Sequence, residues 1–269
     1  MASPTLNATI VRRDEVGPDL LVVGVRPDGP AFDFLPGQYA TLGLPGTHAR
    51  ASNAKADRDP EVAATEKLIK RAYSIASPST QRDSVEFYLN MVDDGAFTPR
   101  LFALPIGGRV WMSTKAVGTF TLEGVTPADD VLLIATGTGL APFMSMLESQ
   151  SETRQGRHWV LVHGTRYVAD LGYHDRLLKL AASRPWLSYL PSVTRPETAW
   201  SGRTGRVQGL FEGGEIEAMT QRQVTPQTAH VYLCGNPDMI TSMQAMLESR
   251  GFKVHKRHDP GQLHIESYW

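Results

Sequence analysis

A turn with two glycines is the segment best suited to hold a phosphate or a flat ring. Residues 136–142 read Thr-Gly-Thr-Gly-Leu-Ala-Pro and follow an apolar run, so bare backbone amides lie where a strand gives way to a helix. The third glycine of the usual six-residue dinucleotide fingerprint is missing, and a tight structural turn also accounts for two glycines. The turn is therefore a candidate ligand site rather than a decisive motif.

The single cysteine of the chain lies in a comparable place. Cys234 ends another apolar run and precedes Gly235 and a helix-like segment, so we expect it at the same carboxyl edge of a sheet. A lone cysteine is also typical of buried filler. At this edge the thiol can instead touch a substrate ring, without acting as a nucleophile.

Several arginines follow later strand ends or lie in the 202–205 loop. A guanidinium group offers paired donors, which suit a phosphomonoester, although arginines in loops are also commonly solvated. These residues are Arg166, Arg195, Arg203 and Arg206.

The first half of the chain contains a cation, an aromatic ring and a hydroxyl within one strand's length, in Arg71-Ala72-Tyr73-Ser74. Strand alternation puts Arg71 and Tyr73 on one face and Ser74 on the other, which an ordinary edge strand also does. Downstream, residues 94–100 can start a short helix whose amides bind a second phosphate. At the chain's end, two aromatics can cover a flat ring or simply dock the terminus.

The elements that position these groups differ between the two halves. Up to about residue 122, short apolar runs such as 20–25, 85–90 and 109–112 alternate with turns, which predicts an antiparallel barrel or sandwich. Residues 46–70 carry charges of both signs. We expect them to form a solvated, partly mobile surface loop without chemistry, with a short helix near 60–68.

After a connector at 124–128, apolar strands alternate with helical segments. The expected strands are 131–135, 159–162 and 230–233, and the expected helices are 143–149, 169–182 and 238–250. This alternation predicts a doubly wound parallel sheet. The fold class is therefore two-domain, with an antiparallel β-barrel at 1–123 followed by an α/β doubly wound domain at 129–269.

Composition agrees with two domains and excludes several partners. The chain has 269 residues, 41% of them hydrophobic, and a formal net charge of -1. That is enough apolar content for two cores, and the bulk charge gives no support for nucleic acid or an acidic membrane surface. Without a signal-like start or an apolar run of about 18 residues, we expect a cytoplasmic protein.

Taken in this order, the segments resemble the plant-type ferredoxin-NADP reductase superfamily, and most closely its bacterial ferredoxin or flavodoxin-NADP reductases. The resemblance implies an FAD-binding barrel followed by an NADP-binding domain, with a C-terminal tail that reaches back to the flavin. The long 46–70 insertion departs from the family pattern. It leaves open how the ferredoxin-facing surface looks.

For FAD, the resemblance implies that Arg71 contacts the pyrophosphate, Tyr73 packs on the isoalloxazine and Ser74 hydrogen-bonds near flavin N5. At the end of the chain, Tyr268 matches the family's terminal aromatic. Trp269 is an extension, and whether it stacks on adenine or on isoalloxazine stays open. The remaining FAD contacts implied are Ala72, Gly95, Ala96, Thr98 and Thr136.

For NADP(H), the resemblance implies that Gly137 and Thr138 belong to the nucleotide turn, with Cys234 and Gly235 beside the nicotinamide. The implied 2′-phosphate clamp consists of Arg166, Thr194, Arg195 and Arg206. The implied catalytic residues are Ser74, Cys234 and Glu266. No metal site is expected.

The resemblance implies hydride transfer between NADPH and FAD and single-electron exchange with ferredoxin or flavodoxin. Electron flow from NADPH would supply reduced carrier to biosynthesis or oxidative-stress defence. One alternative is the reductase component of an oxygenase or cytochrome system. One cysteine cannot hold an iron-sulfur cluster, so that centre is then expected on a separate protein. A second alternative is a flavin-binding redox sensor without turnover. Sequence does not decide the carrier, the physiological direction or the oligomeric state.

Overall fold

The computed structural model describes residues 5–30, 33–151 and 158–267 of the chain. These residues form two compact units. The first unit comprises Met1–Thr121 with Met144–Ser149, and the second comprises Leu122–Phe143 with Gln150–Trp269. The domain limits of 1–123 and 129–269 stay a prediction.

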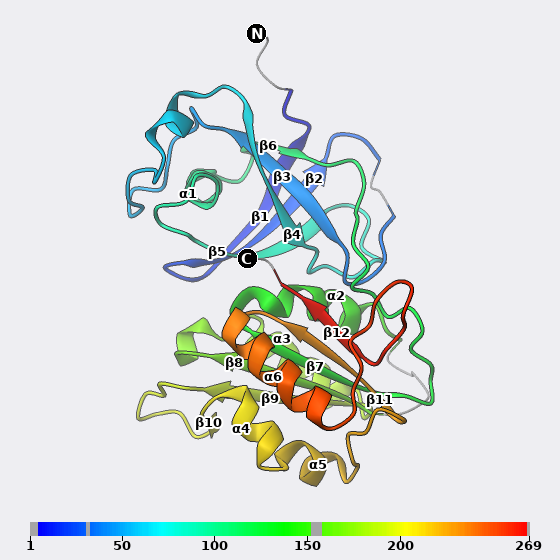
Figure 1. The fold of residues 1–269 in the computed structure, drawn as a ribbon. Helices are drawn as coiled ribbons and strands as arrows, with labels where there is room; N and C mark the ends of the chain where they lie inside the picture. The colour runs from blue at the N-terminus through cyan, green and yellow to red at the C-terminus, as the bar shows by residue number, and fades with distance from the viewer. Residues whose placement is uncertain (1–4, 31–32, 152–157, 268–269) are drawn as a thin grey trace. The chain divides into compact units, whose positions relative to one another are not determined.

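The first unit is built on a six-stranded antiparallel sheet in the order β4-β3-β6-β1-β2-β5 (Figure 1). An isolated bridge joins Ile75, just past β4, to Phe87 on β5, so the two ends of the strand order meet as in a barrel. The strands are β1 (Ala8–Gly17), β2 (Leu20–Pro27), β3 (Tyr39–Pro45), β4 (Leu68–Ser74), β5 (Val85–Asn90) and β6 (Arg109–Met112).

Alternate apolar side chains fill the interior of this sheet. Leu21, Val23 and Val25 of β2 pack with Phe87 and Leu89 of β5 in one buried cluster, as the two-residue period of a strand requires. Helix α1 (Thr98–Ala103) adds buried side chains to the same core. The 3₁₀ helix η1 (Pro60–Ala64) begins after Asp59, whose side chain accepts a hydrogen bond from the amide of residue 61.

The second unit is built on a six-stranded parallel sheet in the order β10-β9-β8-β7-β11-β12. Strand β8 is buried along its whole length, which is typical of a strand covered on both faces. The strands are β7 (Asp130–Thr136), β8 (Trp159–Thr165), β9 (Leu187–Val193), β10 (Arg203–Thr204), β11 (Ala229–Cys234) and β12 (Leu263–Glu266).

Helices cover both faces of the parallel sheet. Helices α4 (Val207–Glu212) and α6 (Pro237–Ser249) pack on the face that carries Leu190 of β9. Helix α3 (His174–Ser183) lies on the other face, where the ring of its first residue, His174, contacts the ring of Tyr189. The remaining elements are η2 (Gly137–Leu140), α2 (Ala141–Glu148), η3 (Val168–Asp170) and α5 (Glu215–Thr220).

These observations confirm the predicted fold class of an antiparallel barrel followed by a doubly wound parallel sheet. The helix expected at 169–182 differs in its start: a short 3₁₀ turn ends at Asp170, and α3 begins only at His174. The interruption falls at Gly172 and at Tyr173, which has a left-handed φ of 60°. No helix in the described ranges has the length and apolarity to cross a membrane.

A row of rings attaches the last described strand, β12, to β11. His264 stacks on Tyr232 with ring centroids 4.2 Å apart and on His255 at 4.5 Å, and its Nε2 lies 3.0 Å from Nδ1 of His230. Burial, and then the neighbouring histidines, lower the pKa of His264 to about 3. His264 is therefore neutral in the folded protein at neutral pH.

This depressed pKa predicts a loss of stability in mild acid. In the unfolded chain the histidine has a pKa near 6.5, so it binds a proton below that pH. In the folded protein it binds the proton only near pH 3. Between pH 7 and pH 5 the free energy of unfolding should fall by about 2 kcal/mol on account of this one group. Urea titrations at both pH values test this.

The variant His264→Phe, which keeps a flat ring in the stack, should show a smaller decrease in stability between the two pH values. An identical decrease in the parent and in the variant would contradict the assignment to His264.

Candidate functional site

The carboxyl edge of the parallel sheet brings the two predicted glycine turns into contact. The amide of Asn236, after β11, donates to the Oγ1 of Thr136, at the end of β7, over 2.7 Å. Because β8 and β11 flank β7 on opposite sides, this edge is where the strand order reverses. Such a switch point is the usual ligand position in open α/β sheets.

Close backbone approach explains two of the glycines. A Cβ at Gly139 would lie 2.3 Å from the carbonyl oxygen of Cys234, and a Cβ at Gly235 would lie 2.2 Å from Oγ1 of Thr136. Gly235 also has a φ of +136°, which side-chain-bearing residues rarely adopt. Gly137, by contrast, faces open space and has a φ of +55°. Gly139 and Gly235 therefore allow the two turns to pack against each other, whereas Gly137 leaves space for a ligand to approach the backbone.

The predicted clamp residues also gather at this edge, beyond β8 and β9. The amide of Arg195 donates to the carbonyl oxygen of Arg166 over 2.8 Å, and the amide of Thr194 donates to Thr165 over 3.0 Å. Arg206 directly precedes α4 and follows Gly205, whose amide donates to the last residue of β9. Backbone pairing thus holds the segments that carry these side chains together.

Most of the arginines near this edge carry a positive charge that no described carboxylate neutralises. Arg166, Arg195 and Arg206 are exposed, and within the described residues none of them forms an ion pair with a carboxylate. Arg203 differs, because its Nε lies 2.9 Å from Glu215. Three cations without acidic partners suit an anionic ligand, whereas Arg203 is already neutralised.

Two residues near this edge were not predicted from the sequence. Tyr167 is 42% exposed, and its hydroxyl lies 3.3 Å from a guanidinium nitrogen of Arg195. His163 is fully buried in β8, where burial lowers its pKa to about 4, and its Nδ1 lies 3.4 Å from the hydroxyl of Tyr189. His163 directly follows the apolar run at 159–162, the same kind of position that singled out Cys234, whereas Tyr167 lies two residues beyond the end of β8.

Two of the predicted catalytic residues are neighbours in this unit. Cys234 and Glu266 end β11 and β12 and are paired in the parallel register. Cys234 is completely buried, whereas Glu266 is half-buried. This placement is compatible with a ring contact for the thiol and equally with core packing, so the role of Cys234 stays a prediction. Tyr268 and Trp269 lie outside the described residues.

The first unit brings its own predicted segments together. Arg71 and Tyr73 on β4 lie opposite Leu42 and Ala40 of β3 and so share their face of the sheet. The ring of Tyr73 packs 5.7 Å from that of Phe97, next to the predicted phosphate segment. Ala72 is exposed and Ser74 is buried on the same strand.

The second segment of this unit, 93–98, is a turn that leads into α1. The amide of Gly95 donates to the carbonyl oxygen of Val92, and Thr98 begins the helix while its Oγ1 accepts from the amide of Val92 over 2.9 Å. Ala96 is half-buried between them. Tyr73, packed on Phe97, therefore joins the two predicted FAD segments within one unit.

The loop at residues 46–70, expected to be a solvated insertion, contains side chains that are largely removed from solvent. The side chains of Asp57 and Arg50 are only 4% and 17% exposed, and both bind other charged groups. The expectation of a solvated segment is wrong for these two residues, because each has a buried ionic partner. Pairing that spans more than forty positions, such as Asp57 with Arg100, cannot be inferred from a local charge pattern.

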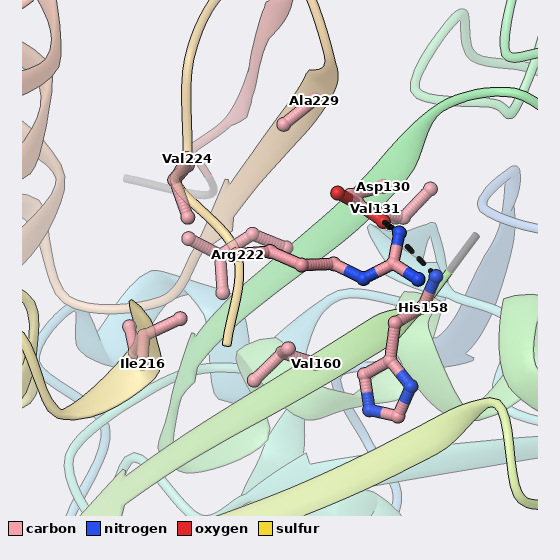
Figure 2. A pocket seen from close by; sticks show the side chains of 9 residues that line it. Asp130, Val131, His158, Val160, Ile216, Arg222, Val224 and Ala229 are labelled. Carbon is pink, nitrogen blue, oxygen red and sulfur yellow. Dashed lines mark hydrogen bonds and ion pairs between the residues drawn. The ribbon is translucent and has the colours of Figure 1, made fainter. Parts of the chain in front are cut away.

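A pocket at the other end of the parallel sheet is not part of this arrangement. Figure 2 shows Arg222 extended across it toward Asp130, which also accepts from the amide of His158 over 3.0 Å. The pocket is lined by residues at the amino ends of β7, β8 and β11, opposite to the glycine turns, together with Ile216 of α5 and Arg222 and Val224 of the segment before β11. Its polar groups, Asp130, Arg222 and the amide of His158, bind one another and connect the starts of β7 and β8. We assign them a structural role.

Comparisons with known proteins agree with this arrangement. The family model described as oxidoreductase NAD-binding domain matches residues 133–245. A flavodoxin/ferredoxin-NADP reductase of Escherichia coli (strain K12) is 34% identical over 241 residues, which cover 89% of this chain and 90% of that protein.

Two solved structures have similar folds. A ferredoxin NADP+ reductase from Neisseria gonorrhoeae with bound FAD and NADP has a TM-score of 0.80 and 25% identity, and the match covers 98% of each chain. A cytochrome P450 reductase from Amycolatopsis has a TM-score of 0.74 and 25% identity, over 98% of this chain and 69% of that one.

The contact between the two turns predicts that Gly235 does not tolerate a side chain. Gly235→Ala should lower the free energy of unfolding by about 1–3 kcal/mol, because the new Cβ meets Thr136 and the backbone has a strained φ. Gly209→Ala is the matched control, since nothing lies within 4 Å of its Cβ position and α4 should gain helix propensity. Equal stabilities of the two variants in urea titrations would contradict the packing argument.

Proposed function

The chain belongs to the family of flavodoxin/ferredoxin-NADP reductases, and on that premise we propose that it transfers a hydride between NADPH and FAD and single electrons between FAD and ferredoxin or flavodoxin. The observation that carries the proposal is the carboxyl edge of the parallel sheet. There, two glycine turns pack together beside three arginines that have no acidic partner in the described part of the chain.

The residues present fit NADP(H). Open space over Gly137 leaves room for the nucleotide beside Thr136 and Thr138, and Cys234 and Gly235 take the nicotinamide side of the same edge. Arg166, Arg195 and Arg206, with Thr194, supply the charge-assisted donors that a 2′-phosphate requires.

The residues of the first unit fit FAD. Arg71 is an exposed cation that forms no ion pair with any described carboxylate, Tyr73 supplies a flat ring, and Ser74 supplies a hydroxyl on the same strand. Ala72, Gly95, Ala96 and Thr98 complete the proposed flavin contacts of this unit. Thr136 remains a predicted flavin contact. Tyr268 and Trp269 remain predicted flavin contacts outside the described residues.

The chain's own groups have supporting parts in this chemistry. FAD, when bound, accepts a hydride and gives up its electrons singly, which no side chain does. Ser74 hydrogen-bonds at the flavin, Cys234 packs against the nicotinamide, and Glu266 modulates nearby charge and proton movement. Their joint effect is to hold the reacting groups in a productive orientation, which raises the rate through proximity.

A second candidate, the reductase component of a cytochrome system, is favoured by the likeness to the Amycolatopsis cytochrome P450 reductase. The two candidates share the hydride step and differ in the electron acceptor. We propose a cytoplasmic enzyme with ferredoxin or flavodoxin as its carrier.

Electron transfer to a carrier tests the proposal. The purified protein should oxidise NADPH with ferricyanide as the electron acceptor. It should reduce cytochrome c only when ferredoxin or flavodoxin is added. Absence of both activities in a protein that binds FAD would indicate a sensor without turnover. Activity with ferricyanide but with neither carrier would favour the second candidate.

The arginines without a described carboxylate partner should determine the preference for NADPH over NADH. Arg195→Ala or Arg206→Ala should weaken NADPH binding roughly ten- to a hundredfold, because a charge-assisted hydrogen bond is worth about 1.5–3 kcal/mol. NADH binding should not change. Arg203→Ala is the control, since Glu215 already engages that side chain, and it should keep the preference for NADPH. Dissociation constants for both coenzymes provide the measurement, and unchanged NADPH to NADH ratios in both test variants would refute the clamp.

The proposed role of Cys234 is separable from core packing. Cys234→Ala should slow the reduction of FAD by NADPH in stopped-flow measurements while the protein keeps its FAD. If the thiol only fills the core, the variant will instead lose stability through a cavity and keep its rate per folded molecule. Thermal unfolding of the same samples separates the two outcomes.

A further inference from the structure

The loop between β3 and β4 contributes two members of a buried ion cluster. The carboxylate of Asp57 accepts hydrogen bonds of 2.8 and 2.7 Å from Arg100 and a further one from Arg50. The side chain of Arg100 is 1% exposed and that of Asp57 4%. Two guanidinium groups therefore share one carboxylate away from water, and loss of that carboxylate would leave buried positive charge without a partner.

This cluster holds a segment that the proposed function assigns to FAD. The four successive carbonyl oxygens of residues 93–96 each accept a hydrogen bond of between 2.7 and 2.9 Å from the loop or from Arg100. Arg50 donates to residues 93 and 95, the amide of Arg58 donates to residue 94, and Arg100 donates to residue 96. The orientation of three of these four peptide groups thus depends on the guanidinium groups of Arg50 and Arg100.

The same bonds determine where the following amides point. In a trans peptide the N–H lies opposite the carbonyl oxygen, and none of the described peptide bonds is cis. The N–H groups of Ala96 and Phe97 therefore point away from Arg50 and Arg100. Among the described residues neither of these two groups donates to a protein acceptor. Amide donors facing away from the buried cations are suited to oxygens of a diphosphate.

We propose that Asp57 is a positioning residue for FAD, which orients residues 93–98 toward the pyrophosphate by holding Arg50 and Arg100 beneath them. The inference rests on the proposed function, because it takes FAD as the ligand of this segment. Hydrogen bonds from Arg100 lower the pKa of Asp57, so the carboxylate is ionised at neutral pH.

Positioning and simple charge attraction predict opposite results for one substitution. Asp57→Asn removes a negative charge, so attraction alone would tighten the binding of an anionic ligand. Under positioning, Arg100 loses its buried partner, leaves its place and releases the carbonyl group of residue 96, so binding weakens. The direction of the change in affinity therefore decides between the two.

The test compares FAD with riboflavin, which has the same ring system but no phosphate. In the full chain freed of flavin, Asp57→Asn should raise the dissociation constant of FAD about tenfold or more and leave that of riboflavin unchanged. Glu61→Gln is the matched control, because it removes an exposed carboxylate of the same loop that forms no ion pair with any described residue. It should behave as the parent.

Three results would overturn the inference: unchanged FAD affinity, tighter FAD binding, or equal loss of FAD and riboflavin affinity, which would mean general destabilisation. If Asp57→Asn does not fold, Asp57→Glu replaces it. That variant keeps the negative charge, so charge attraction predicts an unchanged FAD affinity, whereas positioning predicts weaker FAD binding because the longer side chain cannot keep the same bonds to Arg50 and Arg100. The same three results would overturn the inference. Failure of the parent protein to bind FAD would refute the proposed function itself, and the inference with it.

Discussion

Contact between two backbone turns is the constraint on which the carboxyl edge of the parallel sheet depends. Gly139 and Gly235 let the turns after β7 and β11 approach so closely that a Cβ at either position would overlap backbone or hydroxyl atoms of the other turn. The hydrogen bond from Asn236 to Thr136 then locks them together. Because parallel strands end at one edge, this contact determines where every group that follows those strands can lie.

The arginines of the chain divide into two kinds according to their partners. Arg100 is buried and Arg50 is half-buried against Asp57, and both bind backbone carbonyl groups, so their charge holds the fold of a loop. Arg166, Arg195 and Arg206 are exposed and without carboxylate partners in the described residues, so their charge is available to a ligand. Burial and pairing, rather than residue type, therefore distinguish cations that are committed to structure from cations that are not.

Sequence was sufficient for the fold class because the two halves have different hydrophobic periods. The apolar runs at 131–135 and 159–162 lie within β7 and β8, and the positions of Thr136 and Cys234 at strand ends followed directly. The pairing of Cys234 with Glu266 was not predictable, because it depends on which strands become neighbours. For the same reason the cluster of Asp57 with Arg100 was missed: a mixed-charge loop looks solvated until its distant partner is known.

The central claim is that this chain binds FAD and lets NADPH reduce it. The most direct measurement is the visible spectrum of the purified protein during anaerobic titration with NADPH. We expect a yellow protein whose flavin absorbance bleaches on addition of NADPH and far more slowly with NADH at equal concentration. A protein that carries no flavin, or whose bound FAD stays oxidised in excess NADPH, would contradict it.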